Sequence, residues 1–216
     1  LFRELGDLEN KGIDWKGRVF ISDRAHLVLP RYRDMDKEAD SRRAKPIGTT
    51  GRGIGIAYAL KASRDGIRIA DIDDEERLVN LGSEDREWLF QWKDRLLPLK
   101  IDLAAYLRSH RNTWRLFEGA QGALLDIDTG TYPFVSSGMS CAAGAAAQGG
   151  IGPRAIDRVL GVFKAYSTRV GNGPFPTEFA DDSPGSVSQY IRKVGNEYGT
   201  TTGRPRRCGY LDLVAL

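Results

Sequence analysis

Residues 47–64 read IGTTGRGIGIAYALKASR, in which two threonines and four glycines lead into a helical run. Glycines and small hydroxyls leave backbone N–H groups free to face an anion, so such a turn at the start of a helix predicts a phosphate site. The stretch lacks the lysine–threonine pair of a P-loop and therefore suits a monophosphate, with Lys61 and Arg64 as nearby cations. A glycine-rich turn with basic surface residues is the structural alternative.

The segments around this stretch alternate between helical and strand patterns. Helical spacing covers 1–10, 31–45, 83–97, 101–110 and 153–169, and short apolar runs predict strands at 17–22, 25–30, 66–72 and 113–119. This alternation predicts an α/β fold with a mostly parallel central sheet and helical additions. A chain of 216 residues is long enough for one domain with a sizeable core. Ser83 is expected to cap its helix, and Trp88 and Trp92 are expected to face the core.

Composition excludes several classes of protein. Apolar residues make up 41% of the chain without a run long enough to form a transmembrane helix. The net charge of +3, from 32 basic and 29 acidic residues, is too small to indicate nucleic-acid binding. Cys141 and Cys208 stand apart, which favours a reducing compartment and predicts a cytoplasmic protein. The two histidines, His26 and His110, fit no Ser-His-Asp or zinc-binding spacing.

A second motif, FEGAQGALLDIDTGTYPFVSS at 117–137, follows a predicted strand. Gln121 lies among glycines, so its amide can act in a cleft as both donor and acceptor. Ser136 and Ser137 add hydroxyl groups. Three acidic residues of the motif fit either a magnesium site or, more simply, acidic turns. These are Glu118, Asp126 and Asp128.

A third motif, GTTTGRPRRCG at 199–209, places three threonines and three arginines within a glycine frame. The planar guanidinium of arginine matches a carboxylate or a phosphate in a bidentate manner. Three neighbouring arginines are costly to bury unless anions bind them, so the motif predicts an anion site. A solvated charge run is the alternative.

Four long motifs therefore occur in a fixed order along the chain. They are GTTGRGIG-x-AY-x-x-K-x-x-R, FEGAQG-x-LLDID-x-GTYP, KAYSTRVG-x-GPFPTE and NE-x-G-x-TTGRPRR-x-G. Together they resemble the adenylosuccinate synthetase family over essentially the whole chain. The resemblance implies part of that family's P-loop NTPase-like fold. It also implies the family's reaction in de novo AMP synthesis, in which IMP, L-aspartate and GTP give adenylosuccinate, GDP and phosphate through a 6-phosphoryl intermediate.

The resemblance implies roles for the matching residues. In the family the first motif holds the 5′-phosphate of IMP, so Thr50 is expected to donate to it. Arg64 is expected to reach the IMP of the neighbouring subunit in a homodimer, and Gln121 to read the hypoxanthine edge. The other implied IMP contacts are Ser136, Val170 and Arg204. The loop implied to close on aspartate comprises Thr200, Thr201, Thr202, Gly203, Arg204 and Arg206, of which Arg206 also approaches the GTP phosphates.

Some positions depart from the family pattern. Ser136 stands where threonine is usual, Ile56 replaces a proline, and Ala59 and Leu60 replace polar residues. The family's GDEGKGK-type loop, which carries the catalytic aspartate, has no counterpart here, and neither has the TKLD-type guanine site. Residues 1–216 are therefore expected to be a central fragment of one synthetase domain, without a catalytic residue, with Mg²⁺ ligands mainly elsewhere, and inactive alone.

Hypotheses from other classes stay open at this point. A non-catalytic module that binds purine nucleotides would keep the same motifs. A nucleic-acid-binding fragment would use the GRG and RPRR segments as basic contacts. A phage-type relative that acts on dGMP with ATP also shares the motifs.

Overall fold

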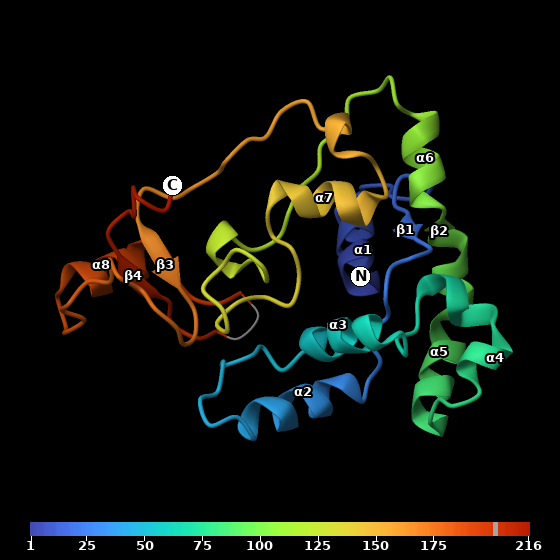
Figure 1. Cartoon of the computed structure of the whole chain (residues 1–216), viewed down its shortest axis with the longest axis horizontal. Helices are drawn as coiled ribbons and strands as arrows, with labels where there is room; N and C mark the ends of the chain where they lie inside the picture. The colour runs from blue at the N-terminus through green and yellow to red at the C-terminus, as the bar shows by residue number, and fades with distance from the viewer. Residues whose placement is uncertain (201–202) are drawn as a thin grey trace.

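The structure, a computed structural model, describes residues 1–200 and 203–216. Thr201 and Thr202, two of the residues expected to bind aspartate, lie outside the described residues. The described chain is mainly helical, with a few short strands between the helices (Figure 1). The α-helices are α1 (Phe2–Asn10), α2 (Tyr32–Ser41), α3 (Ile54–Ser63), α4 (Glu75–Leu78), α5 (Ser83–Leu96), α6 (Leu103–Ser109), α7 (Ala142–Gly149) and α8 (Val187–Val194). The strands are β1 (Ile21–Ser22), β2 (Lys100–Ile101), β3 (Ser167–Arg169) and β4 (Arg207–Gly209). Short 3₁₀ turns are η1 (Ile69–Asp73), η2 (Leu97–Leu99), η3 (Ala123–Leu125) and η4 (Pro153–Ala155).

The predicted α/β class is confirmed. β1 and β2 pair in parallel, with Ile21 opposite Lys100, and β3 and β4 pair antiparallel. Figure 1 shows β1 and β2 beside α4, α5 and α6 at one end, and β3, β4 and α8 at the other. α2 and α3 run side by side along the lower edge of Figure 1, and the connection between them lies at their end nearer to β3, β4 and α8.

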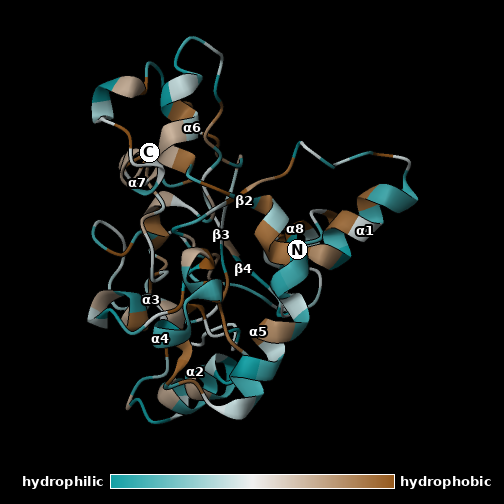
Figure 2. Cartoon of the chain, turned by 90° about the vertical axis from the view of Figure 1, so that its right-hand side faces the viewer, coloured by the Kyte–Doolittle hydropathy of each residue, from teal (hydrophilic) through white to brown (hydrophobic). Residues whose placement is uncertain are grey.

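The main core lies where α5, η1 and the segment 25–32 meet. Leu29 and Tyr32 are the most enclosed of its members, at 0% and 1% exposed. Trp88 and Trp92 pack against this core, as predicted, while α5 turns a hydrophilic face outward (Figure 2). None of the described helices combines the length and the apolar composition that a membrane span requires.

The cap predicted for α5 is wrong. Ser83 is the first residue of the helix, and Gly82 precedes it without a side-chain capping bond. Acidic residues in the first turn still match the positive end of the helix dipole.

The strand predicted at 66–72 is also wrong, because side-chain hydrogen bonds turn the backbone there. Asp71 accepts the backbone N–H of Arg68 at 2.9 Å and its guanidinium at 3.0 Å, which closes the turn η1. A single bridge between His26 and Arg68 is the only ladder contact the described residues show for this segment. The turn instead buries Ile69 and Ile72, three residues apart, on the core side.

The strand predicted at 113–119 and the helix predicted at 153–169 are also wrong. The segment 113–119 is irregular rather than a buried strand, and Trp114 is fully exposed. The helix predicted at 153–169 is limited to η4, and the chain is then extended to β3 with Leu160 83% exposed. β-branched residues and Gly161 lower the helix propensity of this second segment, so a helical apolar spacing did not suffice.

Candidate functional site

A carboxylate of the preceding helix holds the glycine loop, residues 46–53. Asp40, in the last turn of α2, accepts the backbone N–H groups of Ile47 at 2.9 Å, Gly48 at 3.0 Å and Thr49 at 3.2 Å. Burial opposes ionisation of this carboxyl, but the three donors outweigh burial and hold the pKa of Asp40 below its ordinary 3.8. The amides of Ile47, Gly48 and Thr49 are therefore not free to face a ligand, because Asp40 already accepts their hydrogen bonds.

A second carboxylate of α2 fixes the far end of the glycine loop. Asp36, which is 6% exposed, accepts the N–H of Gly53 at 2.9 Å. Gly53 has a φ of +80°, and a Cβ there would lie 2.7 Å from the Cβ of Tyr32, so the position needs glycine. α3 begins at the next residue, Ile54, and its first N–H groups have no acceptor within the helix.

Segments far away in the sequence dock on the carbonyl groups of the glycine loop. Arg204 donates from Nη2 to the carbonyl oxygens of residues 48 and 49, at 3.0 and 3.1 Å. Asn172 donates from Nδ2 to the carbonyl oxygen of Pro46 at 2.8 Å. The structure thus brings Arg204 and the segment that follows Val170 to the glycine loop.

Thr50 is an exposed residue of the glycine loop. A pocket of about 380 Å³ opens there, between the glycine loop and α2. Its lining residues are Lys37, Asp40, Ser41, Pro46, Thr49, Thr50 and Gly51. The Thr50 hydroxyl and the Lys37 ammonium offer hydrogen-bond donors to an anion in this pocket.

Asp126 organises the loop that contains Ser136. This carboxylate is 3% exposed. It accepts hydrogen bonds of 2.6 to 3.2 Å from the backbone N–H groups of Asp128, Thr129, Ser140 and Cys141. These donors, that of Asp128 first, lower the pKa of Asp126 far below its ordinary value. Asp126 is accordingly a turn residue, and the described residues contain no cluster of three or more His, Cys, Asp or Glu side chains that could hold a metal ion.

The same loop packs on the first turns of α3. The Oγ of Ser137 lies 3.4 Å from the position that a Cβ on Gly55 would take, and Gly138 lies against the ring of Tyr58. The neighbouring Ser136 is thereby brought to the end of α3 that follows the glycine loop. Ser136 and Thr50 are thus carried to the same end of one helix.

Gln121 is exposed and has a φ of +64°, in the left-handed region. A residue with a side chain reaches this conformation at a cost of about 1–2 kcal/mol. Such strain concentrates at functional sites, because the surrounding structure must hold it for a purpose. The backbone at Gln121 therefore supports a binding role, although its own chain leaves the side chain uncovered.

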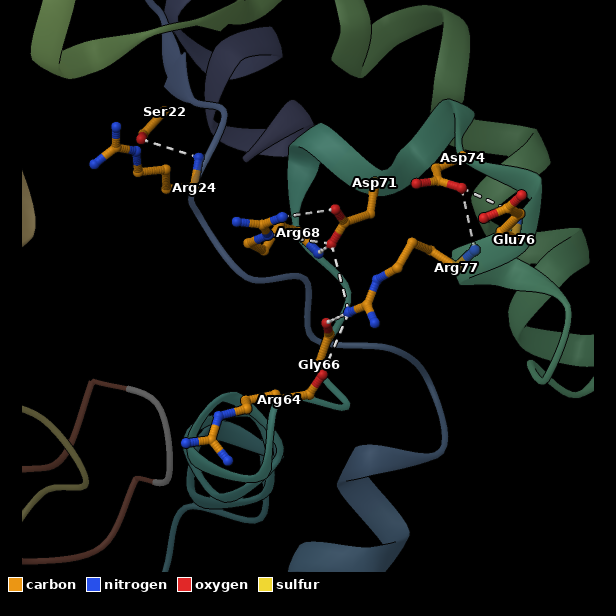
Figure 3. A network of polar contacts seen from close by, with 9 residues as sticks. All are labelled: Ser22, Arg24, Arg64, Gly66, Arg68, Asp71, Asp74, Glu76 and Arg77. Carbon is orange, nitrogen blue, oxygen red and sulfur yellow. Dashed lines mark hydrogen bonds and ion pairs between the residues drawn. The ribbon is translucent and has the colours of Figure 1, made fainter.

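Arg64 lies at the opposite end of α3 from the glycine loop. The helix has ten residues, or roughly 15 Å of length at 1.5 Å per residue. Arg64 ends it in the left-handed region, at a φ of 74°, and its side chain is exposed. Figure 3 shows its guanidinium pointing away from the polar network beside it. A helix length separates Arg64 from the glycine loop of its own chain.

The network beside Arg64 fixes the backbone of this helix end. Arg77 donates from Nη2 to the carbonyl oxygens of Arg64 at 3.4 Å and Gly66 at 3.0 Å (Figure 3). Asp71 lies 3.9 Å from the same guanidinium and also binds Arg68. Asp71 is 4% exposed, so the network is anchored in the core.

The third motif forms an arginine loop, residues 198–206. Tyr198 and Pro205 form an isolated bridge across it, and the N–H of Gly203 donates to Gly199 at 2.7 Å. Arg206 donates from Nη1 to the buried carboxylate of Glu197 at 2.7 Å. Thr200, near the start of the arginine loop, is exposed.

The sequence model of the family described as adenylosuccinate synthetase matches residues 1–87 and 79–216. The chain belongs to the adenylosuccinate synthetase family. Its curated relatives include the adenylosuccinate synthetases of Hahella chejuensis (strain KCTC 2396), at 42% identity, and Xanthomonas campestris pv. campestris (strain B100), at 45%. Each alignment covers 100% of this chain and 55% of the relative. The solved structure of fully ligated adenylosuccinate synthetase from Plasmodium falciparum is similar, with a TM-score of 0.86 and 34% identity over 97% of this chain and 54% of that one.

The chain thus spans about half the length of the synthetases it matches, and it is also shorter within that span. The alignments to both bacterial relatives run over 241 positions, to which this chain supplies 216 residues. The two matched segments of the family overlap at 79–87, where only four residues, 79–82, connect α4 to α5.

Several residues that build the site were not singled out from the sequence. Asp36 and Asp40 lay in a segment predicted as a solvated helix, although their i, i+4 spacing puts both carboxylates on one face just before the glycine loop. Asn172 and Glu197 lie within the second half of the chain, and only the fold brings them to their partners. Ile56 of α3, which departs from the family pattern, packs against the core.

We expect Asp40→Asn to lower the free energy of unfolding at pH 7 by about 1.5–3 kcal/mol, the range for hydrogen bonds to a charged group. Because the folded pKa of Asp40 is depressed, its contribution is fully present above the unfolded value and is lost as pH falls through the folded value. The difference between the two proteins should therefore shrink below about pH 4. Urea unfolding at several pH values measures this difference.

Asp34→Asn is the matched control, since Asp34 is 86% exposed and has only a 3.4 Å pair with Lys37. It should change stability by less than about 0.5 kcal/mol. An Asp40→Asn protein as stable as the control at pH 7 would contradict the assigned role.

Proposed function

We propose that this chain forms the IMP and L-aspartate sites of an adenylosuccinate synthetase. The complete enzyme converts IMP, L-aspartate and GTP to adenylosuccinate, GDP and phosphate. The observation that carries the proposal is the docking of Arg204 on the glycine loop beside Thr50, at 3.0 and 3.1 Å. Two motifs that lie about 150 positions apart in a synthetase-family sequence thereby become one site.

In this proposal IMP binds at the glycine-loop end of α3. Thr50 and Ser136 donate hydroxyl hydrogen bonds to the 5′-phosphate, which also meets the positive end of the helix. The side chain of Gln121 reads the hypoxanthine edge, and the backbone of Val170 contacts the ribose. Arg204 approaches the same nucleotide from the arginine loop.

The arginine loop is proposed to bind the second substrate. Its aspartate-binding residues are Thr200, Thr201, Thr202, Gly203, Arg204 and Arg206, and Arg206 also contacts the phosphates of GTP. The ligands of a catalytic Mg²⁺ are proposed to lie mainly outside residues 1–216. The groups that transfer protons to and from the purine ring are proposed to lie outside them as well.

The proposed enzyme is a cytoplasmic homodimer whose partners are IMP, L-aspartate and GTP, rather than a nucleic acid or a membrane. The exposed Arg64 supports the proposed dimer, because it lies a helix length from the glycine loop of its own chain. A second copy of the chain, related by twofold symmetry, offers the nearest phosphate that this guanidinium could complete.

The function is tested by incubating the complete protein with IMP, L-aspartate, GTP and Mg²⁺ and measuring adenylosuccinate and phosphate. We expect both products in equal amounts, and none above background from residues 1–216 alone. A parallel reaction with dGMP and ATP tests the phage-type alternative. Turnover of dGMP but not of IMP, or binding of IMP without any turnover, would contradict the proposal.

Arg64→Leu should weaken IMP binding by roughly 10- to 150-fold, since a charged hydrogen bond contributes about 1.5–3 kcal/mol. The partner subunit's site suffers the loss, because the altered subunit keeps its own Thr50 and Gln121. Mixing Arg64→Leu subunits with Gln121→Ala subunits therefore creates mixed dimers with one intact site. Activity should return to about a quarter of the wild-type value when the subunits exchange at random. No recovery despite demonstrated exchange would show that Arg64 does not act across the dimer.

A further inference from the structure

Glu197 is a buried carboxylate at the base of the arginine loop. It is 3% exposed, and it lies between α8 and β4. Three side chains donate to it: the hydroxyl of Tyr166 at 2.6 Å, the ammonium of Lys164 at 2.9 Å and Nη1 of Arg206 at 2.7 Å. One carboxylate therefore joins the segment before β3 to the end of the arginine loop.

The ionised form of Glu197 is strongly favoured. Burial alone would oppose ionisation, but hydrogen bonds from Tyr166, Arg206 and Lys164 outweigh it and lower the pKa of Glu197 to about 2. The same contact raises the pKa of Tyr166 to about 12. Across the range in which enzymes are assayed, Glu197 therefore carries a full negative charge toward Arg206.

Backbone hydrogen bonds also connect Glu197 to Arg206. The N–H of Arg206 donates to the carbonyl oxygen of Glu197 at 2.9 Å, and the N–H of Gly199 donates to that of Arg204 at 2.8 Å. Glu197 and Arg206 thus lie at the two ends of the arginine loop and are bonded to each other there. The loop in turn carries Arg204, whose guanidinium contacts the glycine loop.

A guanidinium has five N–H donors, and Arg206 gives its Nη1 to Glu197. The Arg206 side chain is 28% exposed, so it reaches from the buried carboxylate to the surface of the site. A long side chain held at one atom keeps the rest of its planar fork in one direction, which is what bidentate recognition of a carboxylate requires.

We propose that Glu197 is the positioning residue of the aspartate site. It fixes the guanidinium of Arg206 and the two ends of the arginine loop. This inference rests on the proposed function, since it concerns how the same site recognises L-aspartate. Lys164 and Tyr166 balance the charge and the hydrogen bonds of Glu197 on its other side.

The test measures steady-state kinetics of the complete protein and its variants. Glu197→Gln keeps the shape of the side chain and removes its charge, so it should raise the KM for L-aspartate by about 10- to 100-fold. The KM for IMP should change by less than about threefold, because Arg204 keeps its hydrogen bonds to the glycine loop and neither Thr50 nor Ser136 contacts Glu197. Glu197→Asp retracts the charge by one methylene and should give an intermediate KM for aspartate.

A double-mutant cycle separates positioning from a general structural role. If Glu197 acts through Arg206, Glu197→Gln should add little to the loss that Arg206→Leu causes by itself. Glu75→Gln is the matched control, since Glu75 forms an exposed pair with Arg86 far from the arginine loop. It should leave both KM values unchanged.

Three results decide the matter. A wild-type protein that forms no adenylosuccinate would refute the proposed function itself. An active wild type with an unchanged KM for aspartate in both Glu197 variants would overturn the inference alone. Equal rises in both KM values, or losses that add in the double mutant, would assign Glu197 a general structural role and overturn it as well. If Glu197→Gln does not fold, the Glu197→Asp variant decides by the same criteria.

Discussion

Two carboxylates on one face of α2 hold the loop on which the rest of the site is built. Asp40 and Asp36 bind four backbone N–H groups of residues 47–53. A loop that is already shaped loses less conformational entropy when a substrate binds. The same bonds occupy those amides, so in the proposed IMP site the hydroxyl groups and the start of α3 are left to bind the phosphate.

Acceptor groups within the protein stabilise the neighbouring arginines of the third motif without a bound anion. Arg204 is satisfied by two carbonyl oxygens of the glycine loop, and Arg206 by the carboxylate of Glu197. Each guanidinium thus has an acceptor within the protein, so that the cost of bringing two cations near each other is offset. The ligand then completes the site instead of creating it.

The sequence was most informative where local chemistry decides the structure. The helices at 1–10 and 101–110 and the core positions of Trp88 and Trp92 follow from apolar spacing alone, and the family follows from four ordered motifs. The strand predicted at 66–72 failed because one side chain, Asp71, closes a turn that alternation of apolar residues cannot reveal. The roles of Asp40 and Glu197 were not predictable, since each depends on a partner that only the folded chain brings within hydrogen-bonding distance.

The extended segment before β3 shows the limit of reading periodicity in a chain that spans about half of its relatives. Its apolar side chains, such as Leu160 and Phe163, have helical spacing but are 83% and 62% exposed. The spacing of apolar residues indicates which side chains could share one face. Whether that face forms and is buried depends on the whole fold.

The central claim is that α2 shapes the glycine loop before any substrate binds, and amide hydrogen exchange tests it most directly. The exchange of the N–H groups of Ile47, Gly48, Thr49 and Gly53 should be slow without ligand and should change little when IMP is added. Rapid exchange of these four amides in the free protein, with protection only in the presence of IMP, would contradict the account.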